Sequence, residues 1–137
     1  MISPRSIGYA LLRVTLGLVF LGWGVDKFVY GFLQMAQGIQ AEFAKTWLPA
    51  GGAYAFAVVL PFLEVTAGAL LVAGLYTTFA GALAALLMIM LTTGKVIEGN
   101  SETVALNLVY AVAIFLLLHH LADNQLSLDA WRNKKTA

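Results

Sequence analysis

The sequence predicts an all-α, polytopic membrane protein: an antiparallel bundle of four transmembrane helices, with an amphipathic helix at the membrane interface in its first connection. Of its 137 residues, 61% are hydrophobic and only 11% are charged, whereas soluble domains are about 45–50% apolar and about 25% charged. The mean hydropathy is +0.85. Residues 1–137 are expected to form a single membrane domain.

The first apolar stretch covers residues 7–29 and contains the charged residues Arg13, Asp26 and Lys27. It is longer than the roughly 7–15 apolar residues at the centre of a cleaved signal peptide. We therefore expect it to remain in the membrane as the first transmembrane helix.

The connection at residues 31–52 is long and has apolar residues at helical spacing, separated by polar ones. This pattern is typical of an amphipathic helix lying in the membrane interface. A plain polar loop is the alternative. The apolar positions of the pattern are Phe32, Ala36, Ile39, Phe43 and Trp47.

Three further apolar stretches follow, at residues 53–76, 77–97 and 103–121. Each is long enough to cross ~30 Å of hydrocarbon at a rise of ~1.5 Å per residue. Helices are expected because backbone polar groups in lipid must be hydrogen-bonded within the segment. The connections between these stretches are short, which favours antiparallel neighbours. After residue 121 we expect only a short polar tail.

Lysine and arginine near the ends of the helices predict the orientation in the membrane, because cytoplasmic loops carry an excess of both. The terminal segments hold the larger cluster, which places both termini in the cytoplasm and the long first connection outside. The residues of this cluster are Arg5, Arg132, Lys134 and Lys135.

Several function classes are disfavoured by composition. A net charge of +1 gives no reason to expect nucleic-acid binding. With no cysteine, the chain cannot form a disulfide or a thiolate metal site, and it cannot perform dithiol chemistry. His119 and His120 are neighbours that point about 100° apart on a helix, so a bis-histidine haem would require two chains. We expect these histidines to anchor the helix at the interface, and we predict no metal site.

Polar residues within the predicted spans are the candidate functional residues. An ionisable side chain there costs about 2.5–3.5 kcal/mol on insertion scales, so it faces the bundle interior and pairs with another group. Helical projection puts Lys27, rather than Asp26, on the inner face of the first helix. The candidates for ligand binding or a proton relay are Arg13, Lys27, Glu64, Lys95, Asn107 and Tyr110.

Arg13 and Glu64 are predicted to form a buried ion pair. Counted at ~1.5 Å per residue from the inner ends of their helices, their depths differ by a distance that a long arginine side chain can bridge. The other four candidates then form a polar group nearer the outer surface. Two interpretations remain open: these residues hold the helices in register, or they line a polar cavity open to the outside.

Two helices carry short motifs in a fixed order. The first helix contains Leu12 and Arg13 followed by Gly17 and Leu18, and it ends with the sequence Gly-Val-Asp-Lys-Phe at residues 24–28. The second contains the sequence Pro-Phe-Leu-Glu at residues 61–64, followed by Gly-Ala-Leu-Leu at 68–71 and Gly-Leu-Tyr-Thr at 74–77. With these motifs the chain resembles the DoxX family of small bacterial membrane proteins. The position that is usually basic after the last motif is Thr78 here.

The resemblance implies a bacterial or archaeal protein of the cell (inner) membrane. The family is named after a subunit associated with a thiosulfate:quinone oxidoreductase. It suggests a membrane subunit of a quinone-linked redox or oxidative-stress system, with quinone as the possible cofactor. A non-catalytic anchor or assembly factor is the alternative, and a small proton-coupled transporter is a third. Besides the lipid bilayer, the expected partner is another protein or a second copy of the chain.

The predicted orientation can be tested with single cysteines at Ser3, Gln40 and Ser101, because the native chain has none. In intact cells a membrane-impermeant thiol reagent should label positions 40 and 101 and leave position 3 unlabelled. The opposite labelling pattern would overturn the orientation.

Overall fold

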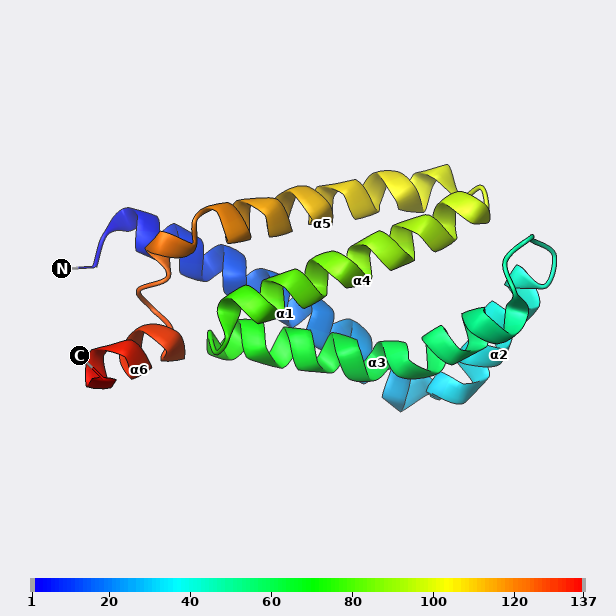
Figure 1. Ribbon diagram of the computed structural model, residues 1–137, viewed down its shortest axis with the longest axis horizontal. Helices are drawn as coiled ribbons and strands as arrows, with labels where there is room; N and C mark the ends of the chain where they lie inside the picture. Colours follow the sequence, from blue (N-terminus) through cyan, green and yellow to red (C-terminus); the bar gives the residue numbers. More distant parts are fainter. Residues whose placement is uncertain (1, 137) are drawn as a thin grey trace.

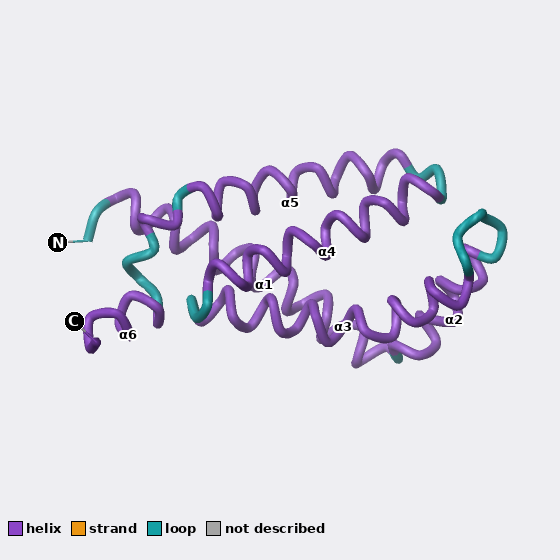
Figure 2. Tube along the Cα trace, viewed as in Figure 1, coloured by secondary structure: helices purple, strands orange, loops and turns teal. Residues whose placement is uncertain are grey.

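A computed structural model describes residues 2–136, and within that range every regular element is a helix (Figures 1 and 2). Four of the helices, α1, α3, α4 and α5, are long and apolar enough to cross a membrane. The predicted helical membrane bundle is therefore confirmed. The elements are α1 (Pro4–Tyr30), α2 (Phe32–Phe43), α3 (Ala50–Ala73), α4 (Thr77–Ile97), α5 (Ser101–His119), a 3₁₀ turn (Leu121–Asp123) and α6 (Leu128–Thr136).

The predicted spans agree with the helices to within a few residues, and α4 covers the predicted range. The largest difference is in α3, which begins at Ala50 and ends at Ala73 instead of covering residues 53–76. The cause of the early end is Gly74, whose φ of +66° is left-handed. Glycine adopts this conformation without steric cost and commonly terminates helices.

The bundle consists of two antiparallel helix pairs. α1 packs along α3, α4 packs along α5, and α3 and α4 join the two pairs. α2 packs against α3 at the end of the bundle opposite the chain termini (Figure 1). The α2–α3 connection and the α4–α5 connection lie at that end, whereas the start of α1 and the helix α6 share the other end (Figure 2).

The contact between α1 and α3 brings the two backbones close together. A methyl group added at Gly68 would lie 2.3 Å from the backbone nitrogen of Leu21 and 2.7 Å from the carbonyl oxygen of Gly17. One added at Gly24 would lie 2.9 Å from the carbonyl oxygen of Pro61. Small residues permit this close approach, which van der Waals packing stabilises in membranes.

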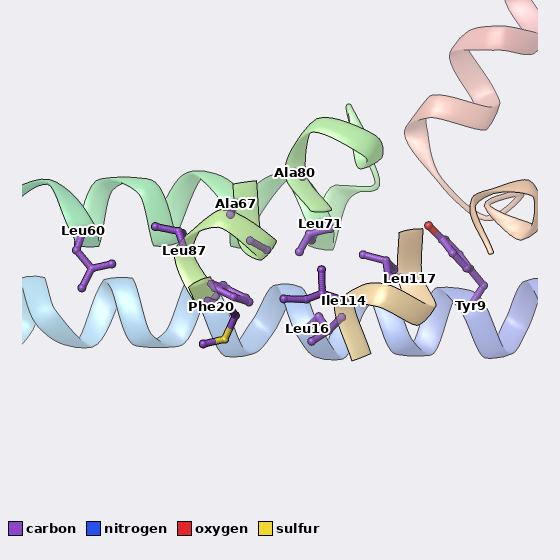
Figure 3. Close-up of a cluster of buried hydrophobic side chains, with 12 residues drawn as sticks. Tyr9, Leu16, Phe20, Leu60, Ala67, Leu71, Ala80, Leu87, Ile114 and Leu117 are labelled. Atoms are coloured by element: carbon purple, nitrogen blue, oxygen red, sulfur yellow. The ribbon is translucent and has the colours of Figure 1, made fainter. Parts of the chain in front are cut away.

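The hydrophobic core lies where the two helix pairs meet (Figure 3). Phe20, Leu71, Leu87 and Leu117 are fully buried there. Large apolar side chains on the outer faces of the same helices are exposed instead, as expected for surfaces that contact lipid. Examples on these outer faces are Leu18, Phe62, Leu86, Ile89, Val109 and Phe115.

The short polar segment at the end of the chain is ordered. It contains the 3₁₀ turn and α6, and α6 is joined to the α3–α4 turn by a hydrogen bond of 2.9 Å from the Asp129 nitrogen to the Gly74 oxygen. Its order depends on contacts with residues far away in the sequence, which the local pattern does not predict.

Replacing Gly68 by alanine should force α1 and α3 apart, since the new methyl group would meet backbone atoms that cannot rotate away. We expect a loss of about 1–3 kcal/mol in the free energy of unfolding, as for other overpacked cores. Titration with a denaturing detergent measures it. Gly22→Ala is the matched control, because nothing lies within 4 Å of its added methyl group. Equal stability of the two variants would contradict the close packing.

Candidate functional site

Lys27 and Glu64 form an ion pair inside the bundle. Lys27 lies in the last turn of α1, and its Nζ is 2.8 Å from Oε2 and 3.0 Å from Oε1 of Glu64. It also donates to the carbonyl oxygen of Trp23 at 3.3 Å. The Glu64 side chain is only 1% exposed and that of Lys27 is 20% exposed. Lys27 therefore faces inward, as predicted, and neutralises a carboxylate that α3 buries.

The predicted pairing of Arg13 with Glu64 was wrong, and the register of α1 against α3 explains why. Gly24 lies against Pro61 and Val65, and Gly17 lies against Gly68. This register puts Lys27 next to Glu64. Depths counted from the helix ends are comparable only if the two helices end at the same level, whereas α1 begins well beyond the level at which α3 ends.

Arg13 instead holds the segment that follows α5. Its Nη1 donates to Asn124 Oδ1 at 3.1 Å, and its Nη2 donates to the carbonyl oxygen of Leu126 at 2.8 Å. The residue is 4% exposed. A methyl group at Gly74 would overlap the guanidinium, lying 1.8 Å from Nη1. Glycine at position 74 thus both ends α3 and leaves space for Arg13.

Asp129 of α6 caps the N-terminus of α4 from a distance in sequence. Its carboxylate accepts hydrogen bonds from the Tyr76 nitrogen at 2.9 Å, the Thr77 nitrogen at 2.8 Å and Thr77 Oγ1 at 2.9 Å. Burial alone would raise the pKa of Asp129, but these hydrogen bonds and the nearby Arg132 lower it below its ordinary value. A negative charge is also favourable at a helix N-terminus.

Sequence reasoning missed Asp129, and the sequence contains only an indirect signal of it. α4 is preceded by Tyr76, which makes no side-chain cap. Ser, Thr, Asp and Asn are the residues preferred at that position. An uncapped helix start therefore predicts a distant cap, but it does not identify the residue that provides it.

Three other predicted site residues lie away from Arg13. Lys95 pairs with Glu98, the residue that follows the end of α4. Asn107 is buried in α5 at 7% exposure. Tyr110 packs edge-on against Trp23 at 5.1 Å between ring centroids. Trp23 thus contacts both Tyr110, through its ring, and Lys27, through its carbonyl oxygen.

A cavity of about 390 Å³ lies between the end of α2, the start of α3 and the end of α4. Its walls are almost entirely apolar and include Phe43, Phe56 and Leu60. Lys95 and Glu98 are the charged residues among the described residues that line it. Of the six predicted site residues, Lys95 lines this cavity, and Leu60 places it one helical turn from the buried Glu64.

The two histidines lie at the other end of α5. His119 stacks on Phe115 with a centroid distance of 5.5 Å. His120 Nδ1 is 2.9 Å from the carbonyl oxygen of Leu116. Among residues 2–136, no group of three or more His, Cys, Asp or Glu side chains is arranged to hold a metal ion.

Comparison with known proteins places the chain by family. The family model DoxX matches residues 8–96, which is well over half of the 137 residues. The matched range contains α2, α3 and nearly all of α1 and α4, and so includes Lys27, Glu64 and Lys95. No curated protein and no solved structure matches the chain.

Removing one partner of the Lys27–Glu64 pair should destabilise the bundle. Lys27→Met leaves Glu64 buried without a counter-charge, so we expect a loss of about 3 kcal/mol or more in the free energy of unfolding. Adding Glu64→Leu should restore much of this loss. Asp26→Asn, at the exposed neighbouring position, is the matched control. If the losses of the two single variants simply add in a double-mutant cycle, the two residues do not interact.

The cap by Asp129 should make stability depend on pH. Because the pKa of Asp129 is lowered in the folded state, its contribution is present above the unfolded pKa of about 3.9 and is lost as pH falls through the folded pKa. Asp129→Ala should cost about 1 kcal/mol at pH 7, and the difference from the native protein should shrink below about pH 4. Thermal unfolding across this pH range measures it. Asp123→Ala, at the same end of the bundle, should show a smaller effect, and equal effects would contradict the cap.

Proposed function

The chain belongs to the DoxX family, and from this premise we propose that it is a membrane subunit of a quinone-linked redox system. In this proposal the cavity between α2, α3 and α4 binds a lipophilic molecule with a small polar head, such as a quinone. The observation that carries the proposal is the combination of about 390 Å³ of nearly apolar space with a single charged pair, Lys95 and Glu98, in its lining. Ligand sites typically combine apolar walls with a few polar groups that orient the ligand.

Lys95 has the role of the orienting group. A quinone carries two carbonyl oxygens that accept hydrogen bonds, and an ammonium group donates to them. Glu98 holds the Lys95 ammonium in place, and a positive charge stabilises electron density that gathers on the bound oxygen. Aromatic and aliphatic side chains such as Phe43, Phe56 and Leu60 would hold the ring and the tail.

Glu64 has a different role in this proposal. Both of its oxygens accept hydrogen bonds from Lys27, which supports a structural function in fixing α1 against α3. On α5, Tyr110 packs against the ring of Trp23, whose carbonyl oxygen accepts a hydrogen bond from Lys27. A protein partner supplies the electrons, because the residues proposed here bind and orient a ligand and do not themselves exchange electrons.

We propose that the chain lies in the cell membrane of a bacterium or archaeon, with both termini cytoplasmic. The start of α1 and α6 lie at the same end of the bundle (Figure 1), and that end carries Arg5, Arg132, Lys134 and Lys135. The positive-inside rule assigns this end to the cytoplasm. The cavity and α2 then belong to the outer half of the membrane.

A membrane anchor or assembly factor is the second candidate. It is supported by the internal pairing of the charged residues: Lys27 with Glu64, Lys95 with Glu98, and Arg13 with groups of the C-terminal segment. Residues paired in this way stabilise the bundle without any ligand. The two candidates differ in whether the cavity must be occupied for function.

Binding of a short-chain quinone to the protein in lipid nanodiscs tests the proposal. The native protein should bind it saturably. Lys95→Met keeps the side-chain volume and removes the donor, so the affinity should fall roughly tenfold or more, the value of one hydrogen bond to a charged group. Lys45→Met, at an exposed position outside the cavity lining, is the matched control. No saturable binding by the native protein, or equal binding by Lys95→Met, would favour the anchor.

A further inference from the structure

A second hollow lies at the terminal end of the bundle, between the start of α4 and α6. This groove has a volume of about 1000 Å³. One wall is formed by Phe79 and Ala82 of α4 and by Leu121, and the opposite wall by α6. The residues of α6 that line it are Asp129, Ala130, Arg132, Asn133 and Lys134.

The lining of the groove changes from polar to apolar along α4. Thr77 is the first residue of the spanning helix α4. Phe79 and Ala82 lie further along the helix, about 3 Å and about 7 Å deeper at ~1.5 Å per residue, and both are exposed. Arg132 and Lys134 of α6 line the same groove near its polar end, where Tyr76 and Thr77 also lie. A phospholipid has the same order, with a charged head group at the surface and acyl chains beneath it.

The charge of the groove favours a negatively charged head group. The single acid in its lining, among the described residues, is Asp129, whose carboxylate accepts three hydrogen bonds from the start of α4. Arg132 lies over the Tyr76 ring at 4.7 Å and within 3.4 Å of Asp129, and these two contacts hold its guanidinium beside the groove. Lys134 adds a second positive charge to the lining.

We propose that this groove binds one anionic phospholipid, with its phosphate at Arg132 and Lys134 and an acyl chain against Phe79 and Ala82. Basic residues near a membrane surface attract anionic lipid, each by about fivefold in affinity, and an apolar wall beside them adds selectivity for a whole lipid over a free anion. The proposal does not depend on the quinone site, which lies at the opposite end of the bundle.

The adjacent lysines of α6 provide a matched pair of variants. Lys134 lines the groove, whereas Lys135 lies 3.7 Å from the centre of the Trp131 ring, outside it. Titration of the purified native protein with phosphatidylglycerol, followed by native mass spectrometry, counts the lipids retained. Lys134→Gln should lower the affinity for the first bound lipid about fivefold, and Lys135→Gln should leave it unchanged. Equal losses in both variants would show general electrostatic attraction and would overturn the site.

Two variants on α4 test the acyl-chain wall. Ala82 is exposed and lines the groove, so Ala82→Trp should fill it and prevent binding of the first phosphatidylglycerol without disturbing the core. Leu86→Trp, one turn further and also exposed, lies outside the groove and should bind normally. Retained binding by Ala82→Trp would overturn the proposal.

Other probes separate the lipid from simpler ligands. Phosphatidylcholine has the same chains without a net negative charge, and inorganic phosphate has the charge without the chains. Neither should compete with phosphatidylglycerol at equal concentration. Displacement of phosphatidylglycerol by inorganic phosphate would assign the groove to a free anion, and displacement by phosphatidylcholine would remove the role of charge; each result would overturn the proposal.

Discussion

The close packing of α1 against α3 is the constraint on which the rest of the structure depends. At Gly17, Gly24 and Gly68 the two backbones approach so closely that no side chain fits between them, and the helices therefore have a single register. In that register Lys27 is the cation that reaches Glu64. The cost of a carboxylate in the bilayer is thus offset by a residue that the same helix contact positions.

The same register leaves Arg13 beyond the end of α3, where it needs partners of its own. The C-terminal segment supplies them through Asn124 and the carbonyl oxygen of Leu126. Once this segment is held, Asp129 reaches the start of α4 and satisfies backbone N–H groups there. The packing of α1 against α3 therefore determines where α6 lies, and with α6 the position of the basic groove.

Much of the fold could be predicted from the sequence because its signals are local. The hydrophobic stretches show the four spans, the helical periodicity of the first connection predicts α2, and projection alone puts Lys27 on the inner face. The pairing of Arg13 failed because depth was counted from helix ends, while the actual register is set by backbone contacts at glycines. Asp129 and the apolar cavity were missed since both depend on how distant segments come together, which no local pattern contains.

The most direct test of this account measures the partner of Glu64 in a lipid bilayer. Solid-state NMR on protein labelled with ¹⁵N in lysine and arginine side chains and ¹³C in glutamate carboxyl groups reports which cation lies beside it. A Glu98→Gln background removes the second lysine–glutamate pair. The account predicts a strong dipolar coupling between the carboxyl carbon of Glu64 and Lys27 Nζ, which is lost in Lys27→Met. A coupling to the Arg13 guanidinium, or none to Lys27, would contradict it.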